Sequence, residues 1–258
     1  MAVIVLCSAA GSPGVSTTAI GLALAWPRPC LLLEADPTGS SAMLTGYMRQ
    51  YAPNGVVSVF DLAVRYRQTG AIPPLMDVAT LVPNTEIRLL SGPRSPSHAA
   101  VINDAWNPLV AQLQQLDGAG IDVLVDLGRL GMTGSPTALL QGADLVALVT
   151  RSTLPALVPA KYWADHLTEI VGADSGRAGL LLISPGHPYS ADDVAKQLKL
   201  PVITTLPNDP TTADVFHLGA KPGRRFDRSP LYRSLPPAAS AIRTQIEASR
   251  RSVQGVQA

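Results

Sequence analysis

The chain has 258 residues, of which 47% are hydrophobic and 15% are charged, and its formal net charge is +1. This composition excludes disorder over most of the length, and the apolar runs are far shorter than the roughly 18 residues of a membrane span. Two cysteines in predicted buried strands, and no basic segment before the first apolar run, favour a cytoplasmic protein without disulfides.

Buried strands and helices alternate along the chain. Residues 2–7 are apolar, which predicts a buried strand, and residues 16–26 predict a helix that Pro27 ends. The same criteria predict later strands at 30–33, 79–82, 87–90, 121–125, 145–149, 179–183 and 202–206. They predict further helices at 40–49, 58–67, 99–116, 136–141, 154–171, 191–198 and 211–218. This alternation predicts an α/β fold with a Rossmann-like, mostly parallel sheet and helices on both faces.

The composition changes near residue 220. We therefore predict a domain over residues 1–220, followed by a basic and partly helical C-terminal tail over residues 221–258. The tail has eight basic residues and two acidic ones, so it carries +6 against −5 for the rest of the chain. Two interpretations stay open: a surface for an anionic partner such as nucleic acid, between Lys221 and Arg251, or a solvated tail.

The stretch between the first strand and the first helix consists of small residues. It reads A-A-G-S-P-G-V-S-T-T over residues 9–18, and strand, small-residue loop and helix are the setting of a phosphate-binding loop. Asp36 and Asp126 close two other apolar strands, at the edge where open α/β sheets bind ligands. Carboxylates there hold Mg²⁺ and its water beside a phosphate loop, so the three strand ends together predict a nucleotide site.

The chain resembles the ParA/MinD family of deviant Walker-type ATPases. Residues 8–17, S-A-A-G-S-P-G-V-S-T, align without a gap with that family's S-A-K-G-G-V-G-K-T-T. The run E-A-D-P-T-G at 34–39 is similar to its D-x-D-P-x-G, and the strand at 121–126 is similar to its Walker B strand. Residues 143–150 and 200–209 look like two later segments of the family. The resemblance spans roughly residues 2–220 and implies a P-loop NTPase-like fold.

The resemblance also implies roles for single residues. Mg²⁺ ligands would be Ser16, Asp36 and Asp126, and Asp36 would also be the catalytic residue that positions the attacking water. From the residues alone, Ser16 is equally a helix cap, Asp36 a stabiliser of the turn at 37–39, and Asp126 an acceptor for a loop N–H. The implied nucleotide-binding residues are Gly11, Ser12, Pro13, Gly14, Val15, Ser16, Thr17, Pro207 and Asn208.

The departures from the family pattern concern charge. Ala10 stands in place of the signature lysine that crosses a dimer interface, and Val15 in place of the Walker lysine. Pro13 removes one backbone N–H donor from the loop. Because two unit charges about 4 Å apart near a protein surface interact by about 4 kcal/mol, losing both lysines weakens triphosphate binding and transition-state stabilisation. Arg129, Arg151 or an arginine of a partner is the alternative source of cation.

These observations lead to a functional hypothesis with alternatives. We expect a degenerate ParA/MinD-like protein with weak or absent ATPase activity that positions or regulates a macromolecular assembly of the partition or pilus/secretion type. The resemblance implies protein partners and a homodimer, with ATP or ADP and Mg²⁺ bound weakly; a pocket without cofactor is the equal alternative. The competing functions are an active Mg²⁺-dependent ATPase with a relocated cationic residue and a nucleic-acid-binding module that uses the tail.

One feature of the tail resembles the membrane-targeting helix of MinD proteins. Ile242 and Ile246 are four residues apart on a basic segment. Because this apolar stripe is narrow, we expect a docking or solvated helix instead of a membrane-binding one.

Overall fold

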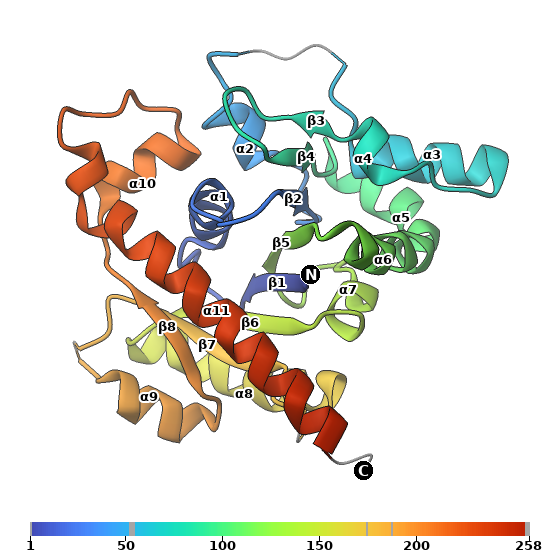
Figure 1. Cartoon of the computed structure of the whole chain (residues 1–258). Coiled ribbons are helices and arrows are strands. Elements are labelled where there is room, and N and C mark those ends of the chain that lie inside the picture. The colour runs from blue at the N-terminus through green and yellow to red at the C-terminus, as the bar shows by residue number, and fades with distance from the viewer. Residues whose placement is uncertain (1, 52–54, 174, 187, 256–258) are drawn as a thin grey trace.

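The computed structural model describes residues 2–51, 55–173, 175–186 and 188–255, and strands from this part of the chain form one central sheet. Its order is β3-β4-β2-β5-β1-β6-β7-β8 (Figure 1). Every neighbouring pair is parallel except β3 and β4, which confirms the predicted mostly parallel α/β sheet. The strands are β1 (Val3–Ser8), β2 (Cys30–Glu34), β3 (Thr80–Leu81), β4 (Arg88–Leu90), β5 (Asp122–Arg129), β6 (Leu145–Arg151), β7 (Ala178–Ile183) and β8 (Val202–Leu206).

Helices cover both faces of the sheet, which is why its central strands β1, β2 and β5 are mostly apolar and almost entirely buried. Along β1, Val3 and Val5 belong to one core cluster while Ile4 and Leu6 belong to the other, as the alternation of side chains across a strand requires. In Figure 1, α1, α10 and α11 lie on one side of the sheet, and α8 on the other. The helices are α1 (Val15–Leu24), α2 (Ala42–Thr45), α3 (Val59–Thr69), α4 (Leu75–Val78), α5 (Ala99–Ile102), α6 (Trp106–Gln115), α7 (Thr137–Gln141), α8 (Leu154–Val171), α9 (Ala191–Leu198), α10 (Pro210–His217) and α11 (Pro230–Gly255).

Two predicted helices differ from the observed ones. The helix predicted at 99–116 is divided into α5, a 3-10 turn and α6, because Pro108 near the start of α6 cannot donate to the preceding turn. The helix predicted at 40–49 is reduced to the single turn α2. Gly46 ends it where its backbone packs so closely on the end of α10 that a Cβ would lie 2.6 Å from the Phe216 carbonyl oxygen.

The C-terminal helix α11 is part of the core. Its apolar residues pack with α1 and β8, and Leu235 approaches α1 so closely that a Cβ on Gly21 would lie 3.1 Å away. Ile242 and Ile246 are both buried, so the docking alternative for this helix is confirmed and a solvated segment describes only its polar face. Within the described residues, no helix combines the length and apolar character that crossing a membrane needs.

Candidate functional site

A cavity of about 560 Å³ opens at the carboxyl ends of the central strands. It is bounded by the loop after β1, the start of α1, the segment after β2, the ends of β5 and β6, and α10 with its preceding connection. All nine residues that the sequence predicted to bind nucleotide line it, and so does Asp36. The structure therefore brings the predicted set together in one place, with Asp126 buried behind it on β5.

The loop between β1 and α1 presents free backbone donors. Gly11, Ser12 and Gly14 all have positive φ, at 74°, 45° and 107°, so this short loop turns sharply. Among the described residues, the N–H groups at 11, 12 and 14–17 have no acceptor, and the first that does is Thr18, which donates to the Gly14 carbonyl at 2.9 Å. Pro13 contributes no donor. Six amides thus remain available to an anion at the positive end of the α1 dipole.

Ser16 is not the cap of α1. The N-cap is Gly14, and no side chain accepts a hydrogen bond from the first turn. The cap interpretation of Ser16 is therefore wrong, because the loop reaches the helix through a left-handed glycine whose lack of a side chain leaves the first amides open. The Ser16 hydroxyl instead forms a hydrogen bond with the Asp126 carboxylate. This bond lowers the pKa of Asp126 and so opposes the larger upward effect of burial.

The two predicted aspartates also make contacts within the protein. An Asp36 carboxylate oxygen accepts a hydrogen bond from the Thr38 N–H at 2.8 Å, which stabilises the turn after β2. Asp126 accepts one from the Gly128 N–H at 3.0 Å. Both structural roles left open by the sequence are therefore present, and the remaining carboxylate oxygens are the ones available for a metal.

Burial raises the pKa of the acids behind the cavity. The pKa of Asp126 rises to about 6, with the Asp36 charge adding to burial while Ser16 and Gly128 oppose it. The pKa of Glu34 rises to about 7, although the Met43 N–H donates to its carboxylate at 2.8 Å and the Gly92 N–H at 3.3 Å. Glu34 and Asp126 are register partners on β2 and β5, so two carboxylates share one water-poor region.

The side chains at the cavity suit Mg²⁺ as partial ligands, but they do not form a complete metal site made of protein alone. Within the described residues, no group of three or more His, Cys, Asp or Glu side chains is arranged to hold a metal ion. Mg²⁺ keeps several waters and takes one or two carboxylates plus phosphate oxygens, so Ser16, Asp36 and Asp126 suffice as protein ligands only when a phosphate is present.

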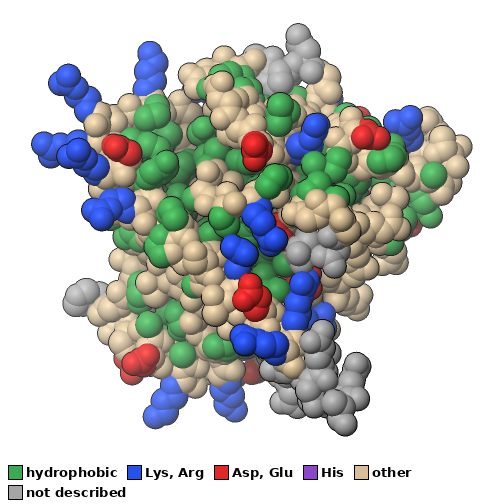
Figure 2. All heavy atoms as spheres, viewed as in Figure 1, with side chains coloured by type: hydrophobic (Ala, Val, Ile, Leu, Met, Phe, Trp, Pro, Cys, Tyr) green, Lys and Arg blue, Asp and Glu red, His purple; other side chains and the backbone are tan. Residues whose placement is uncertain are grey.

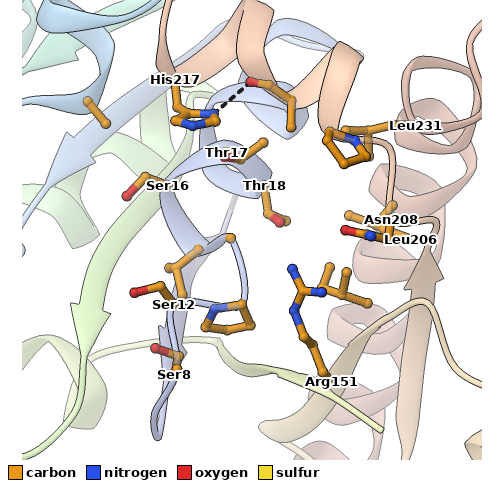
Figure 3. A pocket seen from close by; sticks show the side chains of 18 of the residues that line it. Ser8, Ser12, Ser16, Thr17, Thr18, Arg151, Leu206, Asn208, His217 and Leu231 are labelled. Atoms are coloured by element: carbon orange, nitrogen blue, oxygen red, sulfur yellow. Dashed lines mark hydrogen bonds between the residues drawn. The ribbon is translucent and has the colours of Figure 1, made fainter. Parts of the chain in front are cut away.

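The cationic side chains that line the cavity come from strands, not from the loop. The two strands that flank β1 both end in arginine: β5 at Arg129 and β6 at Arg151. Arg129 is the register partner of Ser8, the last residue of β1, and both arginines line the cavity. In Figure 3 the guanidinium of Arg151 points toward Thr18 and Asn208. The sequence placed both arginines near strand ends but did not show that they flank the same loop.

The far wall of the cavity comes from the end of β8 and from α10. Asn208 points into the space (Figure 3). Asp209 caps α10 by accepting from the Thr212 N–H at 3.2 Å and from the Thr212 hydroxyl at 2.7 Å. His217 and Leu231 close this wall. Sequence reasoning found Pro207 and Asn208 but missed the last two, because their position depends on how α10 and α11 pack.

Comparison with solved structures identifies the fold. The chain is similar to the septum site-determining protein MinD complexed with Mg-ADP from Pyrococcus horikoshii OT3, with a TM-score of 0.72 and 17% identity over 93% of this chain and 95% of that one. It is similar to a ParA family ATPase from Chlorobium tepidum TLS, with a TM-score of 0.70 and 17% identity over 93% and 98%. It is also similar to the MinC:MinD cell division protein complex of Aquifex aeolicus, with a TM-score of 0.70 and 18% identity over 95% and 96%.

These neighbours are ATPases of the MinD and ParA type, and the chain has their P-loop fold. Neither a family model nor a curated protein matches the sequence. At identities below 20% the likeness defines the fold, and the chemistry has to be argued from the residues in the cavity.

Proposed function

We propose that this chain is a degenerate MinD/ParA-like protein with weak or absent ATPase activity, which positions or regulates a macromolecular assembly through protein partners. The observation that carries the proposal is the loop itself. It keeps the backbone of a phosphate site, with six free amides, while Ala10 and Val15 leave it without a cation. The structure of MinD with Mg-ADP supports a nucleotide as the inherited ligand, and the MinC:MinD complex supports a protein partner.

The chain's own residues explain why nucleotide binding would remain although ATP hydrolysis is weak or absent. Loop amides and the α1 dipole attract a phosphate, and Ser16 with Asp126 would hold Mg²⁺, which supplies charge neutralisation when bound. Phosphoryl transfer depends almost entirely on stabilising charge that spreads over the transferred group. Without a loop lysine that stabilisation falls, and Asp36 is already bonded to Thr38 through one of its oxygens. We further propose that the assembly belongs to partition or pilus/secretion machinery. The chain would form a homodimer and would act in the cytoplasm.

Nucleic acid is an alternative partner. The connection from α10 to α11 has four exposed basic residues, none of which makes an ion pair within the described residues: Lys221, Arg224, Arg225 and Arg228. Figure 2 shows Lys and Arg side chains gathered at the corner of the molecule where Figure 1 places this connection. Binding there would tolerate any sequence and would fall steeply with salt.

The second candidate function is an ATPase with a relocated cation. The guanidinium of Arg151, which points into the cavity, favours it. In that case Asp36→Ala would abolish turnover and leave the fold intact, whereas the leading proposal expects no steady turnover to abolish.

Restoring the loop lysine tests the leading proposal. Steady-state ATP hydrolysis and calorimetric titration with ATP and Mg²⁺ would compare the wild-type chain with Val15→Lys, and Val15→Met would control for side-chain length without charge. Since Val15 lines the cavity, we expect Val15→Lys to bind ATP at least roughly 10-fold more tightly than either, as one charge pair is worth about 1–4 kcal/mol here. Tight Mg²⁺-dependent binding with steady turnover in the wild-type chain would contradict the proposal.

A further inference from the structure

The arrangement of positive charge around the phosphate loop has a specific geometry. The loop leaves the carboxyl end of β1, and β1 lies between β5 and β6 in the sheet. Both neighbours end in arginine, at Arg129 and Arg151, at the same edge of the sheet. Two arginines therefore end the strands on either side of a loop that has no cationic side chain of its own.

The fold uses the backbone of each arginine but not its guanidinium group. Within the described residues, neither the Arg129 nor the Arg151 guanidinium makes an ion pair or a hydrogen bond, although both residues line the cavity. Arg151 is partly buried, and its guanidinium points toward Thr18 and Asn208. A guanidinium that is partly withdrawn from water without a protein partner lacks the compensation that such groups normally find.

A second, independent observation concerns hydroxyl groups. Thr18 and Ser8 are 4% and 3% exposed, both line the cavity, and neither side chain makes a hydrogen bond with any described residue. Neither hydroxyl oxygen is among the fully buried side-chain atoms that lack a partner, so both hydroxyls open on the cavity, where a ligand can reach them. Together with the six free loop amides, they surround the end of the cavity that Arg151 enters with donors that lack acceptors.

The acids that line the same cavity are already engaged. Asp209 accepts from both the N–H and the hydroxyl of Thr212, and Asp36 accepts from the Thr38 N–H. Asp214 lies 4.0 Å from His217, on the far wall. The cavity thus separates into a donor-rich end at the loop and a mixed wall of apolar and amide groups at Asn208. Its volume of about 560 Å³ is in the range that takes a nucleotide-sized ligand and is far larger than a single phosphate.

We propose that Arg151 is the phosphate-binding cation of this cavity, and that the ligand is a nucleoside di- or triphosphate whose phosphates lie between the Arg151 guanidinium and the loop amides. Arg129 adds charge from the other flank. The inference rests on the proposed function, because it takes the cavity as an inherited nucleotide site, and it assigns the binding that remains to a residue outside the loop. A planar guanidinium suits a phosphate because it donates two parallel hydrogen bonds.

Calorimetric titration of the full chain with ADP, ATP, adenosine and pyrophosphate tests this assignment, in EDTA so that no metal contributes. Arg151→Gln removes the charge, Arg151→Lys keeps the charge but not the planar guanidinium, and Arg65→Gln is the matched control at an exposed position of α3 outside the cavity. We expect Arg151→Gln to weaken ADP and ATP binding roughly 10- to 100-fold, as a charge-assisted hydrogen bond requires. Adenosine affinity should not change, the affinity of Arg151→Lys for ADP and ATP should lie between those of wild type and Arg151→Gln, and Arg65→Gln should match wild type.

Each contrary result is decisive. The assignment is overturned if the wild-type chain binds neither ADP nor ATP, or if Arg151→Gln binds them as tightly as wild type while its unfolding midpoint is unchanged. Pyrophosphate that binds as tightly as ADP would overturn the nucleoside part. Steady ATP turnover by a wild-type chain whose binding depends on Arg151 would refute the proposed function and leave this inference standing. If the wild-type chain showed no turnover while Arg151→Gln bound nucleotide normally, the proposed function would stand and this inference would be refuted.

Discussion

The acidic side and the basic side of the cavity are built in different ways. The acids behind the cavity, Glu34 at the end of β2 and Asp126 within β5, are buried and bonded to the backbone: Glu34 to Met43 and Gly92, and Asp126 to Gly128. The arginines at the ends of β5 and β6 are more exposed, and their guanidinium groups bond to no described residue. The acids therefore contribute to the hydrogen bonding of the fold, whereas the guanidinium groups do not.

This difference shows which residues inform about function. A carboxylate that satisfies buried N–H groups is retained for stability whether or not a metal ever binds, so its presence says little about chemistry. A cation without a structural partner has no such reason to occupy a cavity, so its position is the better indicator of a ligand. The lysines missing from the loop and the arginines present on the flanking strands therefore weigh more than the aspartates.

Removing the best-integrated acid should produce the largest effect on stability. Glu34→Ala leaves the Met43 and Gly92 N–H groups buried without an acceptor, and we expect the free energy of unfolding to fall by about 2–5 kcal/mol. Urea unfolding at pH 5 checks this. Glu34 is neutral there, so the substitution removes no buried charge whose loss would stabilise the variant. A loss below 1 kcal/mol would mean that this side of the cavity is no more integrated than the other.

The same acid should make stability depend on pH in an unusual direction. Its pKa is raised from 4.5 to about 7 by burial, so the folded chain binds the proton more tightly than the unfolded chain between these values. Stability is therefore greatest below the unfolded pKa and is lost as pH rises through about 7. Between pH 5 and pH 8 we expect the wild-type chain to lose on the order of 2 kcal/mol more than Glu34→Gln, which stays neutral. Parallel curves for the two proteins would contradict this.

The fold was predictable because its signals are local. Continuous apolar runs placed the central strands, and the bounds predicted for α8, α9 and β8 match the structure. The errors came from contacts distant in sequence. Gly46 shortens α2 because of its approach to α10, and α11 is ordered by packing against α1, which its basic composition does not reveal.

The site was predictable only in part, for a related reason. Motif spacing found the loop, Asp36 and the Asn208 segment, which all line the cavity. It did not find Thr18 or His217 as lining residues. The pairing of Arg129 with Ser8 depends on strand order, and strand order places β5 and β6, late in the chain, on either side of β1. No local pattern encodes that adjacency.

The smallest expected effect is the one that most sharply tests the contrast between the two sides. Arg129→Gln and Arg151→Gln each remove a charge that bonds to no described residue, so the free energy of unfolding should change by less than about 0.5 kcal/mol in ligand-free protein. Arg28→Gln is the matched counterexample, because Arg28 donates to buried Asp122 at 2.8 Å and its loss should cost more. Urea unfolding of the three variants at pH 7 measures this. If Arg151→Gln destabilised the chain as much as Arg28→Gln, then Arg151 would have a structural role, and its place in the cavity would no longer indicate a ligand.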